Sequence, residues 1–449
     1  MMDIKGKNIT IIGAMRSGIG AAKLVNKLGG KPFVSDTAKN GKLKESVKVL
    51  KENKIDYETG KHSDKVYKCD IMIVSPGVPS DAAVLVEAKK RSIKVISELE
   101  FASSYCKGKV IAITGTNGKT TTTSMCGHVL NTCGNKTYVA GNIGYAFSEI
   151  TLDVKEDEFV ALEVSSFQLD LTDKFKPRAA VILNITPDHL NRYENKFENY
   201  IASKLTIYKN QDENDYLILN ADSKPLIDSL TEHKGRTYYF STRGIQITGC
   251  YLSGNDIIYN EEGEMKFTCK TDDINLKGEH NYSNAMAVIT AAKIFGCSNE
   301  KIKEGLKTFK GVEHRLEFVR RIAGAIYIND SKATNVDSVW YALKSFESPM
   351  FLILGGQDKG NDYNQIKDLV VEKVKKIYAI GSSAENVFNF FHAFVKVEIK
   401  ESLEEAVKSA NNEAREGDVV LLSPACASFD MFENYEHRGK VFKEAVERL

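Results

Sequence analysis

The sequence predicts an α/β protein of three domains, each built around a largely parallel sheet. Its length of 449 residues corresponds to about three domains of ordinary size. Short apolar runs alternate with helical stretches, and many of these runs end in loops that contain glycine or proline. We therefore expect a Rossmann-like N-terminal domain (residues 1–98), a central P-loop-type mononucleotide fold (residues 99–311) and a C-terminal Rossmann-like domain (residues 312–449).

Composition and charge argue against several classes of protein. The formal net charge is +1, so no overall field attracts nucleic acid or an acidic membrane surface. No apolar run approaches the roughly 18 residues of a membrane span, and no N-terminal apolar region indicates a signal peptide. The eight cysteines form no C-x-x-C pair and no metal-binding spacing, which is usual for reduced thiols. We expect a cytoplasmic protein with neither nucleic-acid nor membrane partners.

A glycine-rich loop in the central segment carries the strongest functional signal. Residues 110–113 predict a buried strand before it, and residues 124–131 predict a helix after it. In that context backbone N–H groups and the helix N-terminus bind phosphate, while Lys119 adds a charge and Thr120 offers a hydroxyl to Mg²⁺. The strict P-loop pattern requires glycine where Ile113 stands, so this loop is a shortened relative of that motif. The alternative to a phosphate-binding loop is a plain Gly/Asn turn between strand and helix. We interpret the loop as an ATP site formed by Gly115, Thr116, Asn117, Gly118, Lys119, Thr120 and Thr121.

The N-terminal segment has the outline of a nucleotide-binding half-domain. A strand at residues 8–12 leads into a glycine-rich turn and a helix that ends near residue 28, and a second strand ends at Asp36. The dinucleotide pattern G-x-G-x-x-G requires glycine where Met15 stands, so nicotinamide binding is disfavoured. A buried strand at residues 71–74 delivers residues 75–79 to the same edge, although proline and glycine there also suit a simple turn. We expect a nucleotide diphosphate that is not a dinucleotide.

Three further residues of the central segment are candidates for metal or catalytic roles. Glu163 ends an apolar strand, where a buried carboxylate requires a partner or a metal, and the alternative is an exposed acid at the strand end. His189 follows another buried strand, although a lone histidine is usually structural. Lys204 lies beside the apolar stripe of a helix at residues 197–208, and this spacing alone favours a lysine whose charged head remains in water. Asn281 and Asn284 share one helix face and suit either an adenine edge or a helix start.

The C-terminal segment predicts a second doubly wound sheet. Its strands are expected at residues 325–328, 350–354, 377–380 and 418–422. The loops after these strands carry lysines, hydroxyls and backbone donors, which suit a small substrate rich in carboxylates. Ser428 is one such residue, and the alternative is that it only caps the next helix.

Together these segments resemble the Mur ligase family, ATP-dependent amide-forming enzymes of peptidoglycan precursor synthesis. The resemblance covers nearly the whole chain, in order. The strings GTNGKTTTT, EVSS, DH at 188–189, GEHNYSNAMA, EHR and NDSKATN are typical of the family. The strings SPGVP, LGGQDKG and LLSPACASFDMFENYEHRG are similar to its D-glutamate-adding branch.

The resemblance implies a role for each matched position near ATP. Lys119 holds the transferring phosphoryl group, Thr120 and Glu163 bind one Mg²⁺, and His189 binds a second. The resemblance also reverses the expectation for Lys204, which matches a lysine that reacts with CO₂ to form a metal-bridging carbamate. Other implied contacts are adenine for Asn281 and Asn284, the ATP phosphates for Arg315, the ribose for Asp330, and a catalytic cation at Lys332.

For the other two substrates the resemblance implies UDP-N-acetylmuramoyl-L-alanine and D-glutamate. The D-glutamate contacts are Thr334, Lys359, Ser428 and the backbone near Tyr435. The contacts to the UDP-sugar are Ser17, Asp36, Thr37, Gly77 and Asn142. Arg16 departs from the usual apolar residue of the first glycine loop, and the uracil contacts lie in a weakly constrained stretch.

Rival functions remain open at this point. A folylpolyglutamate synthase-like ligase shares the core but lacks the first domain and the C-terminal SPACASFD string. A P-loop ATPase does not need the C-terminal carboxylate-binding sheet, and another Mur ligase would add a different amino acid. We expect a monomer that acts on small molecules.

Overall fold

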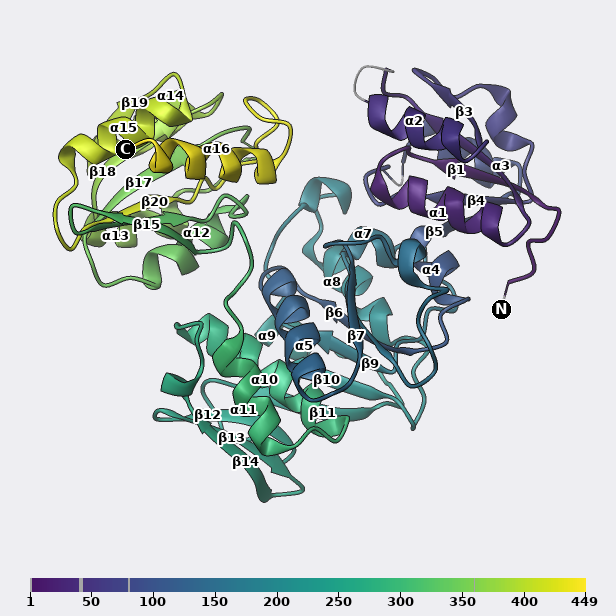
Figure 1. Cartoon of the computed structure of the whole chain (residues 1–449), viewed down its shortest axis with the longest axis horizontal. Helices are drawn as coiled ribbons and strands as arrows, with labels where there is room; N and C mark the ends of the chain where they lie inside the picture. The colour runs from purple at the N-terminus through teal and green to yellow at the C-terminus, as the bar shows by residue number, and fades with distance from the viewer. Residues whose placement is uncertain (1, 40–42, 80, 359) are drawn as a thin grey trace. The chain divides into compact units, whose positions relative to one another are not determined.

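The computed structural model describes residues 2–39, 43–79, 81–358 and 360–449, whose strands form three sheets (Figure 1). This arrangement confirms the predicted α/β class, since most neighbouring strands run parallel. By contacts the chain divides into two compact units, residues 1–275 with 281–309, and residues 276–280 with 310–449. The first unit holds two of the sheets and the second holds one. The domain boundaries at residues 98 and 311 remain a prediction.

The first sheet has five parallel strands in the order β3-β2-β1-β4-β5. Two expected strands, residues 8–12 and 71–74, have the same bounds in the structure. The strands are β1 (Asn8–Ile12), β2 (Lys31–Asp36), β3 (Asp56–Thr59), β4 (Ile71–Val74) and β5 (Lys94–Ser97). The helices are α1 (Arg16–Lys27), α2 (Lys44–Glu52), η1 (Asp64–Tyr67) and α3 (Ala83–Lys90).

The second sheet has nine strands in the order β14-β13-β12-β11-β10-β9-β6-β8-β7, and only the β12–β13–β14 ladder is antiparallel. The strands are β6 (Lys109–Thr114), β7 (Thr137–Gly141), β8 (Phe159–Glu163), β9 (Ala179–Ile182), β10 (Tyr216–Asn220), β11 (Arg236–Ser241), β12 (Gly249–Ser253), β13 (Asp256–Glu261) and β14 (Glu264–Lys270). The helices are α4 (Glu98–Ser103), α5 (Lys119–Thr132), α6 (Phe147–Ile150), α7 (Ser166–Leu169), η2 (Leu190–Arg192), α8 (Phe197–Leu205), η3 (Thr206–Tyr208), α9 (Lys224–Asp228), η4 (Thr271–Asp273), α10 (Glu279–Ile294) and α11 (Asn299–Thr308).

The third sheet has six strands in the order β15-β16-β20-β17-β18-β19, and only β15 pairs antiparallel. The strands are β15 (Glu317–Ile322), β16 (Ala325–Asn329), β17 (Met350–Gly355), β18 (Val374–Ile380), β19 (Lys396–Ile399) and β20 (Val419–Leu422). The helices are α12 (Val336–Lys344), α13 (Asn364–Lys373), α14 (Ala384–Phe391), α15 (Leu403–Glu413) and α16 (Tyr435–Glu447).

Helices cover both faces of the third sheet, and this explains its continuous apolar strands. Leu352 and Leu421 pack into one buried cluster, while Phe351 and Val420 pack into another. Because successive side chains of a strand point to opposite faces, both sets must be apolar when both faces are covered.

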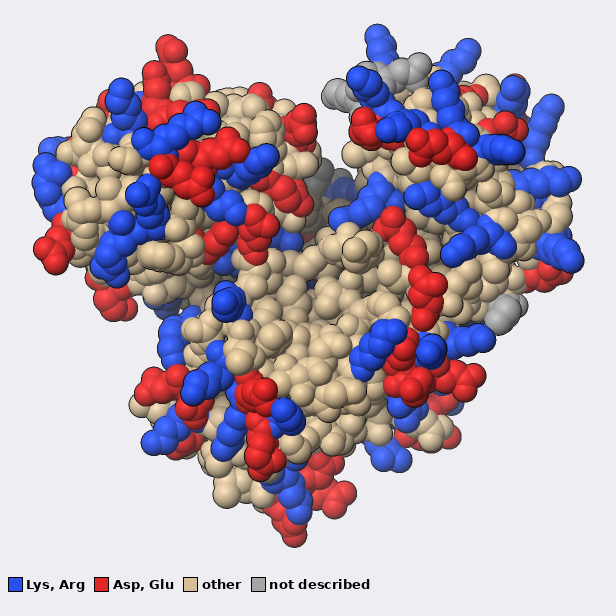
Figure 2. Space-filling model, viewed as in Figure 1, with Lys and Arg blue, Asp and Glu red and all other residues tan. Residues whose placement is uncertain are grey.

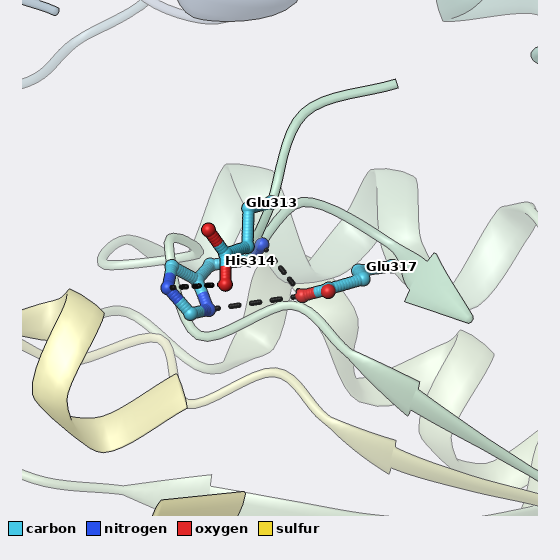
Figure 3. A group of neighbouring side chains, drawn as sticks. All are labelled: Glu313, His314 and Glu317. Atoms are coloured by element: carbon cyan, nitrogen blue, oxygen red, sulfur yellow. Dashed lines mark hydrogen bonds and ion pairs between the residues drawn. The ribbon is translucent and has the colours of Figure 1, made fainter. Parts of the chain in front are cut away.

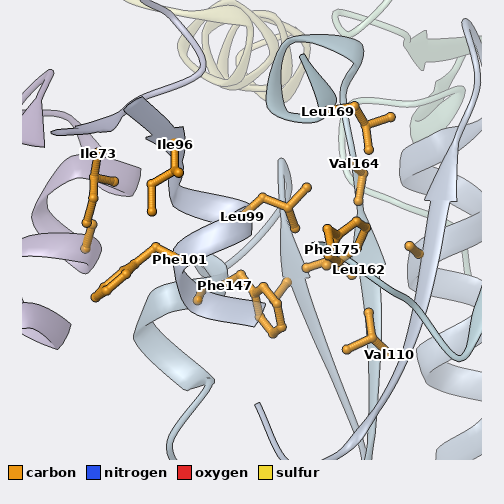
Figure 4. Packing of buried hydrophobic residues seen from close by; sticks show 14 of the residues in the cluster. Ile73, Ile96, Leu99, Phe101, Val110, Phe147, Leu162, Val164, Leu169 and Phe175 are labelled. Atoms are coloured by element: carbon orange, nitrogen blue, oxygen red, sulfur yellow. The ribbon is translucent and has the colours of Figure 1, made fainter. Parts of the chain in front are cut away.

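One apolar core joins the first and second sheets (Figure 4). Ile73 and Ile96 come from the first sheet, and Val110 and Leu162 come from the second. Between them lie Leu99 and Phe101 of α4 and Phe147 of α6, all of them fully buried. The predicted boundary at residue 98 therefore falls at the start of a helix that packs into this shared core.

The surface shows no concentration of one charge in the view of Figure 2, where Lys and Arg are intermixed with Asp and Glu.

Within the described part of the chain, no helix combines the length and the apolar character that crossing a bilayer requires.

A buried carboxylate in α4 binds the backbone of the loop between α7 and β9. Glu100 is 3% exposed and accepts hydrogen bonds from the backbone N–H groups of Asp173, Lys174 and Phe175 at 2.9–3.1 Å. We expect Glu100→Ala to leave these donors unsatisfied and to lower the free energy of unfolding by about 3 kcal/mol. Urea unfolding followed by circular dichroism measures this loss.

Glu98 offers a matched control for that experiment. It lies in the same helical turn and is also buried. Among the described residues, one of its carboxylate oxygens accepts only from the N–H of Ser148, at 2.7 Å, and the other has no hydrogen-bond partner. Glu98→Ala should therefore destabilise the protein less than Glu100→Ala. An equal loss in both variants would contradict the role given to Glu100.

Candidate active site

The glycine-rich loop connects β6 to α5, and its glycines are required by its geometry. Gly115 and Gly118 have φ angles of 154° and 82°, which favour glycine. A Cβ atom on Gly118 would lie 2.6 Å from Oδ1 of Asn284. The loop therefore places bare backbone at the N-terminus of a 14-residue helix, which is a suitable arrangement for binding a phosphate.

A second loop, which follows β9, holds the glycine-rich loop in place. The backbone N–H of Thr116 donates to the carbonyl of Asn184 at 2.9 Å, and the N–H of Asn117 donates to Asn184 Oδ1 at 2.8 Å. The hydroxyl of Thr116 donates to the carbonyl of Thr186 at 3.0 Å. No role for Asn184 was predicted from the sequence. Its position directly after a buried strand was the available signal.

Lys119 and Lys204 meet at one backbone carbonyl. The ammonium nitrogens of both lysines lie 2.9 Å from the carbonyl oxygen of Gly115. Lys204 is 1% exposed, so the expectation from helix spacing that its head lies in water is wrong. Burial, assisted by the charge of Lys119, lowers the pKa of Lys204 well below its ordinary value. The neutral amine form of Lys204 is therefore more accessible than that of an exposed lysine.

Glu163 is buried beside the glycine-rich loop. It is 1% exposed, which contradicts the alternative of an exposed acid, and it pairs in register with Ile113 of β6. Asn142 donates its side-chain N–H to Glu163 Oε1 at 2.9 Å. Thr120, the second residue of α5, is also buried. The structure thus brings two predicted residues, Glu163 and Asn142, into direct contact.

His189 has a strained backbone at the start of η2. Its φ angle is 53°, in the left-handed region that a non-glycine residue rarely adopts. Its ring meets the ring of Phe167 edge-on at 5.1 Å between centroids, and Nε2 lies 3.7 Å from Asp188 Oδ2. About one third of the side chain is exposed (35%), so the imidazole is accessible from solvent.

The two asparagines of α10 lie against the glycine-rich loop. Asn284 donates to Asn281 Oδ1 at 3.5 Å, and both residues are buried. The close approach of Asn284 to Gly118 places this amide pair at the loop.

In the first sheet the predicted residues lie at the carboxyl ends of neighbouring strands. Asp36 ends β2 and accepts from the N–H groups of Ala14 and Ala38 at 2.7 and 2.8 Å. Ser17 lies in the first turn of α1 and is half-buried, while Thr37 and Gly77 are exposed. Because β2, β1 and β4 are adjacent, their loops share one edge of the sheet.

In the second unit, Asp330 and Arg315 lie close together. Arg315 Nη1 is 3.9 Å from Asp330 Oδ1, and Asp330 Oδ2 accepts from the hydroxyl of Ser423 at 2.9 Å. Burial raises the pKa of Asp330 to about 6, although the charge of Arg315 and the hydrogen bonds oppose this shift.

Three of the residues predicted for D-glutamate, Thr334, Ser428 and Tyr435, follow β16 or β20 in the chain, and the predicted catalytic cation Lys332 lies in the same loop as Thr334. Lys332 Nζ lies 5.1 Å above the ring of Tyr435, and Ser428 is buried. The alternative that Ser428 caps the next helix is wrong, because the N-cap of α16 is Asn434. Thr334 is half-buried, and Lys359 lies outside the described residues.

Family models match all three segments of the chain. The Mur ligase middle domain matches residues 113–292, the Mur ligase glutamate ligase domain matches 314–426, and the MurD N-terminal domain matches 9–84. The chain is 45% identical to UDP-N-acetylmuramoylalanine–D-glutamate ligase of Christiangramia forsetii, covering 99% of this chain and 100% of that protein. This chain belongs to the Mur ligase family. It is also 41% identical to the ligase of the same name from Salinibacter ruber, over 100% of this chain and 99% of that one.

Solved structures show the same fold at lower sequence identity. The UDP-N-acetylmuramate–alanine ligase of Thermotoga maritima aligns with a TM-score of 0.66 and 20% identity, covering 98% of this chain and 99% of that one. The MurF ligase of the same organism, solved with ADP, aligns with a TM-score of 0.59 and 17% identity over 93% and 95% of the two chains.

A buried arginine of this Mur ligase, which was not predicted from the sequence, organises the end of the third sheet. Arg438 is 1% exposed, and its guanidinium donates to the carbonyl of Ser331 at 2.8 Å and to that of Cys426 at 3.1 Å. Burial lowers the pKa of Arg438 to about 10. Arg438 thus ties the loop after β16 to the loop after β20. The signal available in the sequence was its place in the HRG string.

Glu313, His314 and Glu317 form a group with the spacing of a metal site, yet their partners argue against a metal (Figure 3). Asn329 donates to His314 Nδ1 at 2.9 Å. The ammonium of Lys443 pairs with both glutamates. The group therefore has its cation already, and it orients the segment that carries Arg315.

The buried carboxyl group of Asp330 predicts a pH dependence of stability. Its pKa is raised from 3.8 to about 6 in the folded protein, so folding binds a proton that the unfolded chain releases. The free energy of unfolding should fall by about 3 kcal/mol as the pH rises from about 4 to above 6, and then remain level. Asp330→Asn should remove this part of the dependence, as measured by urea unfolding across that range. Parallel curves for the two proteins would contradict the assignment.

Proposed function

We propose that this Mur ligase joins D-glutamate to UDP-N-acetylmuramoyl-L-alanine, using ATP and releasing ADP and phosphate. Relatives at 41–45% identity over their full length carry the name of this activity. The observation that carries the proposal is the meeting of Lys119 and the buried Lys204 at the carbonyl of Gly115. This arrangement occurs in a chain whose first segment matches the MurD N-terminal domain.

The chemistry of the reaction requires activation of a carboxylate, because oxide is a very poor leaving group. The alanyl carboxylate of the UDP-sugar takes the γ-phosphoryl group of ATP, and the amine of D-glutamate then displaces phosphate through a tetrahedral intermediate. In this proposal Lys119 stabilises the charge on the transferring phosphoryl group. The glycine-rich loop and the N-terminus of α5 hold the nucleotide phosphates.

The residues around the loop fit Mg²⁺, whose ligands are mainly oxygen atoms. Bound Mg²⁺ would neutralise phosphate charge. Thr120, in the first turn of α5, offers a hydroxyl, and Glu163, at the end of β8, offers a buried carboxylate. His189 is proposed as a ligand of a second Mg²⁺. Since it offers nitrogen, it is the least typical member of this set.

We further propose that Lys204 is carbamylated. Its neutral amine attacks CO₂ and loses one proton, which yields a carbamate anion in place of a cation. The carbamate would offer Mg²⁺ a carboxylate-like group in the place of an ammonium group that repels it. It also ends the repulsion between Lys204 and Lys119, which is one of the causes of the lowered pKa.

The remaining assignments are proposals for the two units. In the second unit, Arg315 and Asp330 would contact the ATP phosphates and ribose, and Lys332 would be a nearby catalytic cation. Asn281 and Asn284 would contact adenine. D-Glutamate would contact Thr334, Lys359, Ser428 and Tyr435, and the UDP-sugar would contact Ser17, Asp36, Thr37, Gly77 and Asn142. We propose that the enzyme acts as a cytoplasmic monomer.

The choice of amino acid tests the proposed reaction. With ATP, Mg²⁺ and UDP-N-acetylmuramoyl-L-alanine, phosphate release should require D-glutamate. L-Glutamate, L-lysine and diaminopimelate should each be slower by more than about 100-fold, because a site built for particular carboxylates leaves its polar groups unpaired with other ligands. Release with L-lysine or diaminopimelate, but not with D-glutamate, would identify a different Mur ligase.

The carbamate can be tested separately. Lys204→Arg keeps the positive charge but does not form the carbamate, so we expect turnover to fall by about 100-fold or more. Turnover of the unsubstituted enzyme should fall in CO₂-depleted buffer and recover when bicarbonate is added. Lys209→Arg changes an exposed lysine nearby and should leave turnover unchanged. Full activity of Lys204→Arg would rule the carbamate out.

A further inference from the structure

The turn that carries His189 also contacts the first sheet, through an arginine that the proposed mechanism does not use. The backbone N–H of Arg192, at the end of η2, donates to the carbonyl of His189 at 2.9 Å. Its guanidinium donates from Nη2 to the carbonyl of Val78 at 2.8 Å and from Nη1 to the carbonyl of Pro76 at 3.3 Å. One residue thus connects the histidine turn with the loop that follows β4.

Phe167 supports this arginine and also contacts His189. The guanidinium carbon of Arg192 lies 3.9 Å from the centroid of the Phe167 ring. The same ring meets His189 edge-on at 5.1 Å between centroids. A planar guanidinium held on an aromatic face has little freedom, so its two donors define where the two carbonyls lie.

The loop that Arg192 holds packs in turn against the glycine-rich turn of the first sheet. The N–H of Ser75 donates to the carbonyl of Ile12 at 3.0 Å. A Cβ atom on Gly13 would lie 2.7 Å from the hydroxyl oxygen of Ser75. Displacement of the 75–79 loop would therefore disturb the turn before α1 as well. Both segments carry residues proposed for the UDP-sugar, Gly77 and Ser17.

We propose that Arg192 is a positioning residue, which fixes the UDP-binding loop of the first sheet relative to the His189 turn of the second. The inference rests on the proposed function, because it assigns the 75–79 loop to the UDP-sugar. Arg192 acts through backbone carbonyls, so it fixes the path of the loop rather than contacting the ligand. Its loss should weaken binding of the UDP-sugar selectively, without a comparable effect on D-glutamate.

Arg192→Ala tests this role, because it should change the binding of one substrate and not that of the other. We expect the KM for UDP-N-acetylmuramoyl-L-alanine to rise by about 10-fold or more, as loss of two charge-assisted hydrogen bonds implies, while the KM for D-glutamate stays within about twofold. Isothermal titration of the UDP-sugar without ATP should show the same loss in Kd. Arg192→Lys retains the charge but not the planar fork of donors, so it should recover part of the affinity.

Arg178→Ala is the matched control. Arg178 belongs to the same unit, is also half-buried, and lies over an aromatic ring, with its guanidinium carbon 5.3 Å from the centroid of Tyr216. This variant should leave both KM values unchanged. A normal Kd for the UDP-sugar in Arg192→Ala would overturn the inference, as would equal losses for every substrate that follow a lowered Tm. Absence of D-glutamate-dependent turnover in the unsubstituted enzyme would instead overturn the proposed function.

Discussion

The candidate active site of this Mur ligase depends on two lysines, Lys119 and Lys204, whose ammonium groups both contact the buried carbonyl of Gly115. Two ammonium groups beside one oxygen repel each other, and burial makes it more costly for both to stay charged. Burial, assisted by the charge of Lys119, lowers the pKa of Lys204, which is the more deeply buried of the two lysines. The surrounding loops must be rigid to maintain this contact. The hydrogen bonds from Thr116 and Asn117 to the loop after β9 provide that rigidity.

Buried polar groups in this protein fall into two sets with different physical roles. Glu100 and Arg438 are surrounded by backbone partners that satisfy them, so they fix the paths of loops. Lys204, by contrast, is buried next to a like charge, a placement that favours a change of its chemical state. A buried ionisable residue with a structural role can thus be distinguished from one with a chemical role by whether the groups around it stabilise its charged form.

The sequence predicted many of the parallel strands, because these are apolar runs bounded by turn residues, but it did not predict β3, β5, β10, β11 and β19. The strands at residues 8–12 and 71–74 have the predicted bounds. The antiparallel ladder β12–β13–β14 was missed. β14 alternates exposed and buried residues between Lys266 and Lys270, and this alternation is a weaker signal than a continuous apolar run. The alternative interpretation of Ser428 placed a helix directly after it, but the next helix begins only at Tyr435, because the intervening residues form a loop.

The sequence by itself determined the class of fold, the glycine-rich loop and the residue types near it, since these follow from local patterns of apolar, glycine and charged residues. Only the tertiary structure decided which polar side chains are buried and what they contact. Lys204 meets Gly115 across 89 positions of the chain, and Arg192 meets Val78 across 114. Spacing within one helix carries no information about such partners, because burial is set by the elements that pack against it from elsewhere in the chain.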